Sequence, residues 1–283
     1  MCVGVGLMLC GSWGEPSRAD AQFVAGVDLV EVYASVTGPG GELVQDLTAR
    51  DFAVSEDGEP QTITAFASSD VPLAVALAID RSFSIPADRL RSAAVAAAGF
   101  IRALQPSDQV MVIGVGSEVE VLAPLSDSRA AALDALARVD SWGTTPLYDA
   151  ARHALDLIHA AVGRRALILV SDGADRYSRS TAAGLIDHAR RRHVLVYPIA
   201  IGPARPPVFV ELAAVTGGRS ALASDPQRLA AVFDGVAAEL RAQYLLGYSP
   251  AREPASAPQW RSIGVRVSRP GVSVRARDGY FGS

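Results

Sequence analysis

An uninterrupted apolar run that ends at a carboxylate constrains the fold of this chain more than any other feature. Residues 73–79 carry no polar side chain, and Asp80 follows them directly. A run of this length, bounded by Pro72 and by polar residues, is typical of a strand that is buried on both faces. Because such strands belong to parallel sheets that helices cover, the run predicts an α/β fold.

The region after this run alternates helical and strand patterns. The helical patterns lie over residues 87–105, 128–139, 147–161, 181–192, 208–216 and 225–243, and the strand patterns over 109–116, 119–125, 166–173 and 194–201. This alternation favours a doubly wound, mostly parallel sheet of the Rossmann-like kind. The segment 119–125 follows its neighbour too closely for a crossover helix, so we expect an antiparallel edge strand there.

Both ends of the chain show β patterns instead. Alternating apolar residues mark strands within 27–66, and similar patterns follow at 244–248, 260–268 and 272–276. Each end alone is too short to seal a hydrophobic core, so we expect the two β segments to form one small β-sandwich, with the α/β unit inserted between them. The predicted division is a signal peptide at 1–25, an N-terminal β segment at 26–70, the α/β domain at 71–243, and a C-terminal β segment at 244–283 that packs against 26–70.

The N-terminal segment resembles one that is removed on export. Residues 2–10 form an apolar core that is shorter than the ~20 residues of a membrane-spanning helix. Ala19-Asp20-Ala21 matches the A-x-A pattern of a signal-peptidase site. We therefore predict export to the periplasm, cell surface or medium after cleavage near Ala21, with no membrane span in the mature chain. A basic n-region is missing, so a cytosolic N-terminus and lipoprotein processing at Cys10 stay open as alternatives.

Composition restricts the chemistry further. Both cysteines, Cys2 and Cys10, lie in the predicted signal peptide, so the mature chain would have neither disulfides nor thiol catalysis. The net charge of −4 gives no general attraction to nucleic acid. The chain contains no lysine, and no phosphate-binding loop or G-x-S-x-G elbow follows a predicted strand. These features predict a protein that is not an enzyme and does not bind nucleic acid.

Oxygen-bearing side chains recur in loops where ligands of a parallel sheet would sit, at the carboxyl ends of the strands. In chain order they are Asp80, Ser82, Ser84, Thr145 and Asp172. Alternate residues of an extended segment share one side, so positions 80, 82 and 84 can point the same way. Carboxylate and hydroxyl oxygens suit a hard divalent cation, and we predict one site for Mg2+ or Mn2+.

Three motifs resemble a known metal site. They are Asp80-x-Ser82-x-Ser84, Gly143-Thr144-Thr145-Pro146-Leu147 and Ser171-Asp172-Gly173. Together they resemble the metal-ion-dependent adhesion site (MIDAS) of von Willebrand factor type A domains, over about residues 71–243. The resemblance implies that Ser82, Ser84 and Thr145 bind the metal directly and that Asp80 and Asp172 act mostly through water. An acidic residue of a partner protein then completes the coordination.

The flanking segments resemble a narrower group. Residues 47–61, 244–248 and 269–281 are similar to stretches of secreted proteins of Acidobacteria that place this domain between β segments. The resemblance implies a metal-ion-dependent protein-binding module, for adhesion or assembly, in an exported bacterial protein. Two alternatives stay open: a structural module with a vestigial metal site, and a magnesium-dependent hydrolase.

Neighbours of the candidate ligands carry separate expectations. The resembled family usually has glycine at the position of Phe83 and a small or polar residue at that of Arg81. We expect Phe83 to turn toward the core or to cap the site, and Arg81 to point away from the cation. Two positions are open to Trp142, the rim of a binding surface and the core, and we expect the core. Asp175 is expected in solvent. Hydrogen bonds that orient the ligands are expected from Thr144, Asp149 and Ser171.

Overall fold

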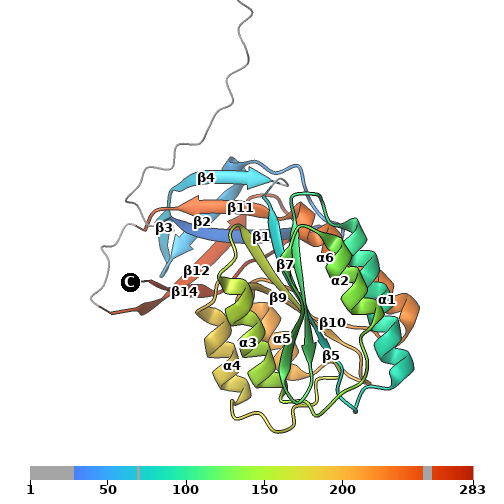
Figure 1. The fold of residues 1–283 in the computed structure, drawn as a ribbon. Helices are drawn as coiled ribbons and strands as arrows, with labels where there is room; N and C mark the ends of the chain where they lie inside the picture. The colour runs from blue at the N-terminus through green and yellow to red at the C-terminus, as the bar shows by residue number, and fades with distance from the viewer. Residues whose placement is uncertain (1–28, 69–70, 251–256, 283) are drawn as a thin grey trace, which may run out of the picture.

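The apolar run that ends at Asp80 forms a central strand of a six-stranded sheet. The computed structural model describes residues 29–68, 71–250 and 257–282, and in it β5 (Leu73–Asp80) is buried along its whole length. The strand order is β10-β9-β8-β5-β6-β7, and Figure 1 shows the sheet between two layers of helices. β5 runs parallel to β6 (Gln109–Val115) and β8 (Arg164–Ser171), and β9 (Leu195–Ala200) continues the parallel set.

The two edges of this sheet differ from its interior. β7 (Val119–Ser126) pairs antiparallel with β6, which confirms the predicted edge strand. At the opposite edge, β10 (Ala221–Leu222) pairs parallel with β9. Two residues are too few to carry a periodic pattern, and the sequence does not predict this strand. The predicted fold class, a doubly wound and mostly parallel α/β sheet, is confirmed.

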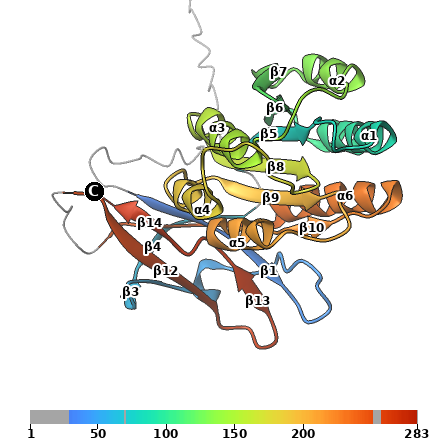
Figure 2. The ribbon, with the colours of Figure 1, turned by 90° about the horizontal axis from the view of Figure 1, so that it is seen from below.

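Helices cover both faces of the sheet, as the alternating pattern predicts. Figure 2 shows α1, α2 and α6 on one side of the sheet and α3, α4 and α5 on the other. Each helix coincides with a predicted helical segment to within two residues at either end. Their bounds are Ala87–Ala103 (α1), Arg129–Ala137 (α2), Leu147–His159 (α3), Ala182–Arg190 (α4), Pro207–Thr216 (α5) and Pro226–Ala242 (α6).

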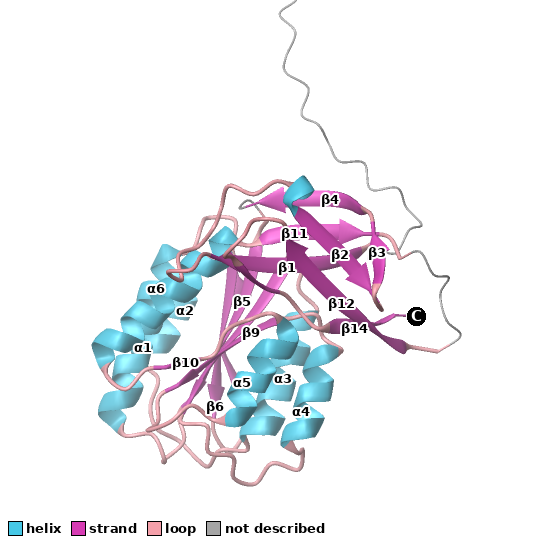
Figure 3. Ribbon diagram, turned by 180° about the vertical axis from the view of Figure 1, so that it is seen from behind, coloured by secondary structure: helices cyan, strands magenta, loops and turns pink. Residues whose placement is uncertain are grey.

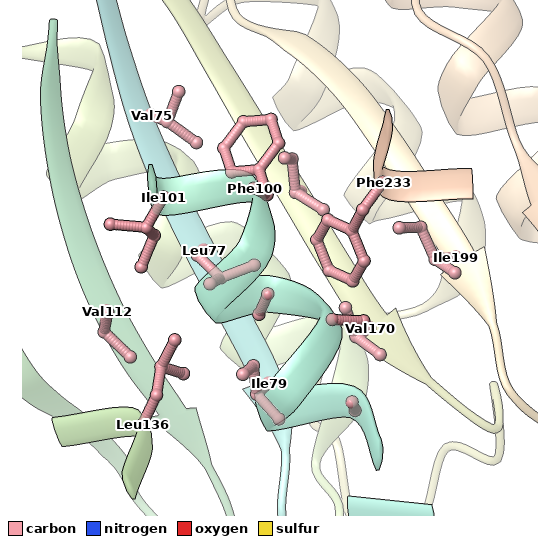
Figure 4. Packing of buried hydrophobic residues seen from close by; sticks show 14 of the residues in the cluster. Val75, Leu77, Ile79, Phe100, Ile101, Val112, Leu136, Val170, Ile199 and Phe233 are labelled. Atoms are coloured by element: carbon pink, nitrogen blue, oxygen red, sulfur yellow. The ribbon is translucent and has the colours of Figure 1, made fainter. Parts of the chain in front are cut away.

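Side chains of β5 alternate between two hydrophobic clusters. The cluster under α1 and α6 takes Val75, Leu77 and Ile79, whereas the cluster under α3 takes Ala74, Ala76 and Ala78. Phe100 of α1 and Phe233 of α6 lie over the larger side chains, with ring centroids 5.9 Å apart (Figure 4). Burying each such ring contributes about 1.5–3 kcal/mol. The alanine face leaves room for α3, so α3 packs directly on the strand.

Strands from both ends of the chain build two further sheets of four strands each, with the orders β13-β1-β11-β4 and β14-β12-β2-β3. Strands β11 and β12 from the C-terminal region lie in the middle of these sheets, β11 between β1 and β4 and β12 between β14 and β2. The buried side chains of both sheets form one apolar cluster. The strands are Val30–Thr37 (β1), Phe52–Glu56 (β2, after the short 3-10 helix Ala49–Asp51), Glu59–Gln61 (β3), Ile63–Ser68 (β4), Tyr244–Tyr248 (β11), Gln259–Val267 (β12), Ser273–Arg275 (β13) and Gly279–Gly282 (β14).

A buried carboxylate joins the two small sheets. Glu56 of β2 is 3% exposed and accepts hydrogen bonds from Tyr248 (2.9 Å), Tyr280 (2.8 Å) and the Nη1 of Arg261 (2.9 Å). Burial and the hydrogen bond to Glu56 raise the pKa of Tyr280 to about 12. Since Tyr248 belongs to the other sheet, the network fixes one sheet against the other.

A second buried carboxylate joins the small sheets to the α/β unit. Glu239 of α6 is 2% exposed and accepts hydrogen bonds from the hydroxyls of Ser35 (3.4 Å) and Tyr197 (3.0 Å). It also pairs with Arg219 (2.8 Å) and Arg275 (2.9 Å). Figure 3 shows the small sheets at one end of the α/β unit, while the loops that follow the parallel strands gather at the far end.

The predictions for the N-terminus lie outside the described residues. These are the signal peptide at 1–25, the cleavage near Ala21 and the placement of Cys2 and Cys10. The division into four regions likewise stays a prediction. Within the part of the chain that the structure describes, no helix is long and apolar enough to cross a membrane.

Candidate metal centre

The site begins at the carboxyl end of β5, where Asp80 is fully buried. One carboxylate oxygen accepts the backbone N–H of Ser82 (3.0 Å), and the other accepts the hydroxyl of Ser171 at the end of β8 (2.6 Å). The Ser171 hydroxyl accepts in turn from the backbone N–H of Gly173 (3.0 Å). Asp80 therefore links the carboxyl ends of two neighbouring strands, and Ser171 has the supporting position expected of it.

The two serines after Asp80 point toward each other. The Oγ atoms of Ser82 and Ser84 are 3.0 Å apart, and either can be the donor. Ser82 is 1% exposed, whereas Ser84 reaches the surface. The predicted clustering of Asp80 with these two hydroxyls is thus present in the structure.

A second loop brings Thr145 to the same place. Thr145 is 3% exposed, and its carbonyl oxygen accepts the backbone N–H of Arg176 in the third loop (2.7 Å). The carbonyl of Gly143 accepts the backbone N–H of Phe83 in the first loop (3.0 Å). Gly143 adopts φ +81°, and a side chain there would meet the backbone of Ser117 at 2.5 Å, so the loop needs glycine. Backbone hydrogen bonds thus hold the Thr145 loop between the other two.

Asp172 follows β8 in the third loop. Its Oδ1 accepts the backbone N–H of Ala174 (2.9 Å), and the residue is half-buried. Burial raises the pKa of Asp80, and the negative charge of Asp172 raises it further. A cation between these carboxylates would offset both effects. The electrostatics of the site therefore suit a positive ion.

The structure ties the five predicted ligands together to different degrees. Asp80, Ser82 and Ser84 are joined by direct hydrogen bonds. Asp172 is placed by its neighbour Ser171, and Thr145 by the backbone of its loop. Within the described ranges, no group of three or more His, Cys, Asp or Glu side chains is placed to hold a metal ion. The candidate set instead combines two carboxylates with three hydroxyls, a donor set suited to hard cations.

Arg81 lies between Asp80 and Ser82 in the first loop, but its side chain turns toward the sheet edge. Its guanidinium is buried, with Nη2 at 2.5 Å from Glu120 of β7 and Nη1 at 3.3 Å from Asp140. It lies 5.2 Å from the ring centroid of Trp142, whose backbone N–H donates to the Arg81 carbonyl (2.7 Å). The guanidinium charge is therefore neutralised locally. The expectation of a core position for Trp142 is wrong, because its side chain is 41% exposed and covers Arg81 instead.

Phe83 does not lie in the core, which was one of the two positions expected of it. The side chain is 73% exposed, so it does not turn toward the core. The serines on either side of it point their hydroxyls at each other, and the phenyl ring projects from the same loop into solvent.

The remaining polar neighbours support the loops. Thr144 lies 3.3 Å from the hydroxyl of Ser117, and the Asp149 carboxylate accepts the backbone N–H groups of Arg179 (2.7 Å) and Ser180 (3.0 Å). Asp175 is not the solvated residue that we expected. It accepts the Tyr148 N–H at the start of α3 (3.1 Å) and the Ser178 hydroxyl (2.6 Å), and so caps that helix. This cap lies 27 residues away along the chain, beyond the range of local sequence patterns.

Comparison with known proteins gives one family match. Residues 75–174 match the family model described as "von Willebrand factor type A domain". The matched stretch begins inside β5, ends after Asp172 and includes every predicted ligand. No curated protein matches the chain.

Several solved structures are similar to this one. A von Willebrand factor type A protein from Catenulispora acidiphila has a TM-score of 0.55 at 17% identity, covering 92% of this chain and 65% of that one. The corresponding domain of the type V pili tip protein Mfa5 from Porphyromonas gingivalis gives 0.52 at 13% identity, covering 60% of this chain and 95% of that one. Proximal thread matrix protein 1 from the mussel byssus, "with zinc occupied MIDAS motif", gives 0.56 at 16% identity, covering 66% and 50%. At these identities the likeness shows the fold.

Proposed function

Because the α/β unit of this chain has the fold and the family signature of a von Willebrand factor type A domain, we propose that it binds a partner protein through one divalent cation. The hydroxyls of Ser82, Ser84 and Thr145 would hold Mg2+ or Mn2+, with Asp80 and Asp172 beside them. The cation would supply a positive charge at the surface, where a carboxylate of the partner binds. The observation that supports the proposal is that hydrogen bonds join the three loops that carry these five oxygen-bearing residues.

Relatives give the proposal its setting. One similar structure is a pilus tip domain and another is a matrix protein of the mussel byssus. A pilus tip domain and a byssus matrix protein agree with an exported module for adhesion or assembly. We propose export of this chain on the same grounds, together with its N-terminal sequence.

A second candidate is a structural module that binds no metal. The hydrogen bonds that Asp80 receives, and the contact between Ser82 and Ser84, satisfy much of the site internally. The third alternative, a magnesium-dependent hydrolase, lacks support in the residues around Asp80. The guanidinium that follows Asp80 directly, that of Arg81, is engaged by Glu120 and Asp140 and is not free to bind a phosphate.

Calorimetric titration of the purified chain separates the first two candidates. We expect Mg2+ or Mn2+ to bind at one site and to raise the free energy of unfolding by about 2.7 kcal/mol when the free ion is a hundred times its Kd. Absence of both heat and stabilisation would support the metal-free structural module. A reference titration in excess chelator sets the baseline.

Gly116→Ala tests whether the Thr145 loop must stay in place. A Cβ at Gly116 would lie 2.6 Å from the Trp142 carbonyl oxygen and 2.7 Å from its ring, so this loop has to shift. We expect the free energy of unfolding to fall by about 1–3 kcal/mol and Mg2+ affinity to weaken about tenfold. The matched control is Gly99→Ala in α1, where a Cβ meets nothing within 4 Å. That variant should gain about 0.5–1 kcal/mol and keep its Mg2+ affinity, and equal behaviour of the two variants would contradict the role given to Gly116.

A further inference from the structure

The three loops of the candidate metal centre carry large exposed side chains. Phe83 is 73% exposed, Tyr177 77% and Trp142 41%. Backbone hydrogen bonds fix their positions close to the site: Phe83 donates to Gly143 (3.0 Å), and Arg176, which precedes Tyr177, donates to the Thr145 carbonyl (2.7 Å). Tyr177 also holds φ +76°, a strained value for a residue with a bulky side chain. Exposed aromatic rings at one site are typical of interaction surfaces.

Two arginines lie in the third loop, close to Tyr177 in the chain. Arg176 and Arg179 are exposed, and in the part of the chain that the structure describes neither guanidinium forms an ion pair or hydrogen bond. Two acidic residues beside them are already engaged: Asp175 accepts from Tyr148 and Ser178, and Asp149 accepts the backbone N–H groups of Arg179 and Ser180. The two positive charges are therefore available to an anionic partner.

Negative charge lies toward the β7 edge of the sheet, whereas the third loop follows β8 on the other side of β5. Glu120 and Asp140 pair with Arg81, and their side chains are 57% and 81% exposed. Glu118, in the turn before β7, is exposed as well. These three carboxylates outnumber the one guanidinium that pairs with two of them, that of Arg81, so the net charge here is negative. The face around the candidate metal centre is thus basic beside the third loop and acidic beside the first.

We propose that this face binds an acidic segment of a partner protein through three contacts. One carboxylate of the segment completes the cation site, a second carboxylate lies toward Arg176 and Arg179, and an apolar side chain packs on Phe83. The inference rests on the proposed function and adds the chemistry of the partner to it. The acidic side repels a carboxylate, so the charge pattern also fixes the direction in which the segment lies.

Short synthetic peptides provide the probe. Each carries a fixed central Asp, while one Glu and one Phe are moved through the other positions on a Gly/Ser background. A second set carries Lys in place of Glu. Binding is measured by fluorescence anisotropy in Mg2+ and again in chelator. We expect at least one arrangement to bind about tenfold more tightly than the peptide with Asp alone, and only in Mg2+.

Surface variants test which residues cause the peptide preferences for Glu and for Phe. Arg176→Glu combined with Arg179→Glu should reverse the preference for Glu, so that the tightest peptide carries Lys instead. Phe83→Ser should remove the preference for Phe. Both variants should keep the Mg2+ affinity of the wild type. The controls are Arg266→Glu on β12 and Val95→Ser on α1, where the valine is 72% exposed; neither should change any peptide preference.

The outcomes separate the two proposals. A chain that binds no Mg2+ overturns the proposed function and this inference together. A chain that binds Mg2+ but responds equally to all peptides, or whose preferences survive both surface variants, overturns this inference alone. Tighter binding of peptides with Lys than with Glu by the wild type overturns it as well.

Discussion

Asp80→Asn is expected to abolish Mg2+ binding while leaving the metal-free fold at least as stable as the wild type. The substitution removes the charge but keeps the shape, so Asn can still accept a hydrogen bond from Ser82 or Ser171. Loss of an ionic group beside the metal lowers affinity by at least about a hundredfold, because even residues that only support metal ligands contribute ten- to a hundredfold. Calorimetry measures the affinity, and urea unfolding in chelator measures the stability.

The pH dependence of the metal-free chain follows from the same residue. Burial raises the pKa of Asp80 in the folded state above its value in the unfolded chain. The folded state then holds this proton more tightly, so the stabilisation is present at acidic pH and is lost as the pH rises through the folded pKa. Asp80→Asn removes this loss, and its advantage over the wild type should grow toward neutral pH.

Asp149→Asn is the matched control. A hydrogen bond from Ser180 and the backbone N–H of Arg179 hold the pKa of the Asp149 carboxyl below its usual range. Ionised Asp149 therefore stabilises the fold above the unfolded pKa, and the amide should lower stability at neutral pH while Mg2+ binding persists. Asp80→Asn should lose Mg2+ binding and keep its stability, whereas Asp149→Asn should lose stability and keep Mg2+ binding. Retained Mg2+ affinity in Asp80→Asn would contradict the proposed site.

Arg261→Met is expected to destabilise the two small sheets by about 3–5 kcal/mol, since it leaves the Glu56 carboxylate buried without its ionic partner. Glu56 is 3% exposed and the Arg261 side chain 8%, so water cannot replace the lost interaction easily. Hydrogen exchange of the backbone amides in β1, β2, β11 and β12 reports the loss. Strands from both ends of the chain should lose protection together, because the same network spans both sheets.

Arg269→Met provides the comparison within the same region. Arg269 pairs with Asp46 at 2.6 Å, but their side chains are 38% and 73% exposed. An exposed pair of this kind contributes about 0–1 kcal/mol. Equal losses for the two variants, or loss of protection confined to strands from one end, would show that the buried network does not join the sheets.

The fold was largely predictable because its elements follow local periodicity. The run up to Asp80 predicts β5, and the amphipathic pattern of residues 147–159 predicts α3, each from a short continuous stretch of sequence. β14 (Gly279–Gly282) is not predicted, because two glycines flank two aromatics and no alternation is visible. Its strand conformation depends on pairing with β12, which the local sequence does not encode.

The candidate site was likewise predictable only in part. The oxygen-bearing residues could be selected because each follows a recognisable strand or precedes a helix. Repulsion by a cation led us to expect that Arg81 points away, but its partners could not be identified, since Glu120 and Asp140 lie 39 and 59 residues further along the chain. The exposure of Trp142 follows from that arrangement, because its ring lies over a guanidinium that is held from two distant segments.

The pairing of β4 with β11 determines how mechanical tension travels through the molecule. The α/β unit leaves the small sheets after β4 and returns at β11, and these strands pair antiparallel with Ser68 directly opposite Tyr244. A pull between β1 and β14 can therefore cross from β4 to β11 through the hydrogen-bonded ladder, without passing through the α/β unit. The candidate metal centre lies at the far end of that unit, so a stretched chain would keep its binding face undistorted while the β1–β11 and β4–β11 ladders hold.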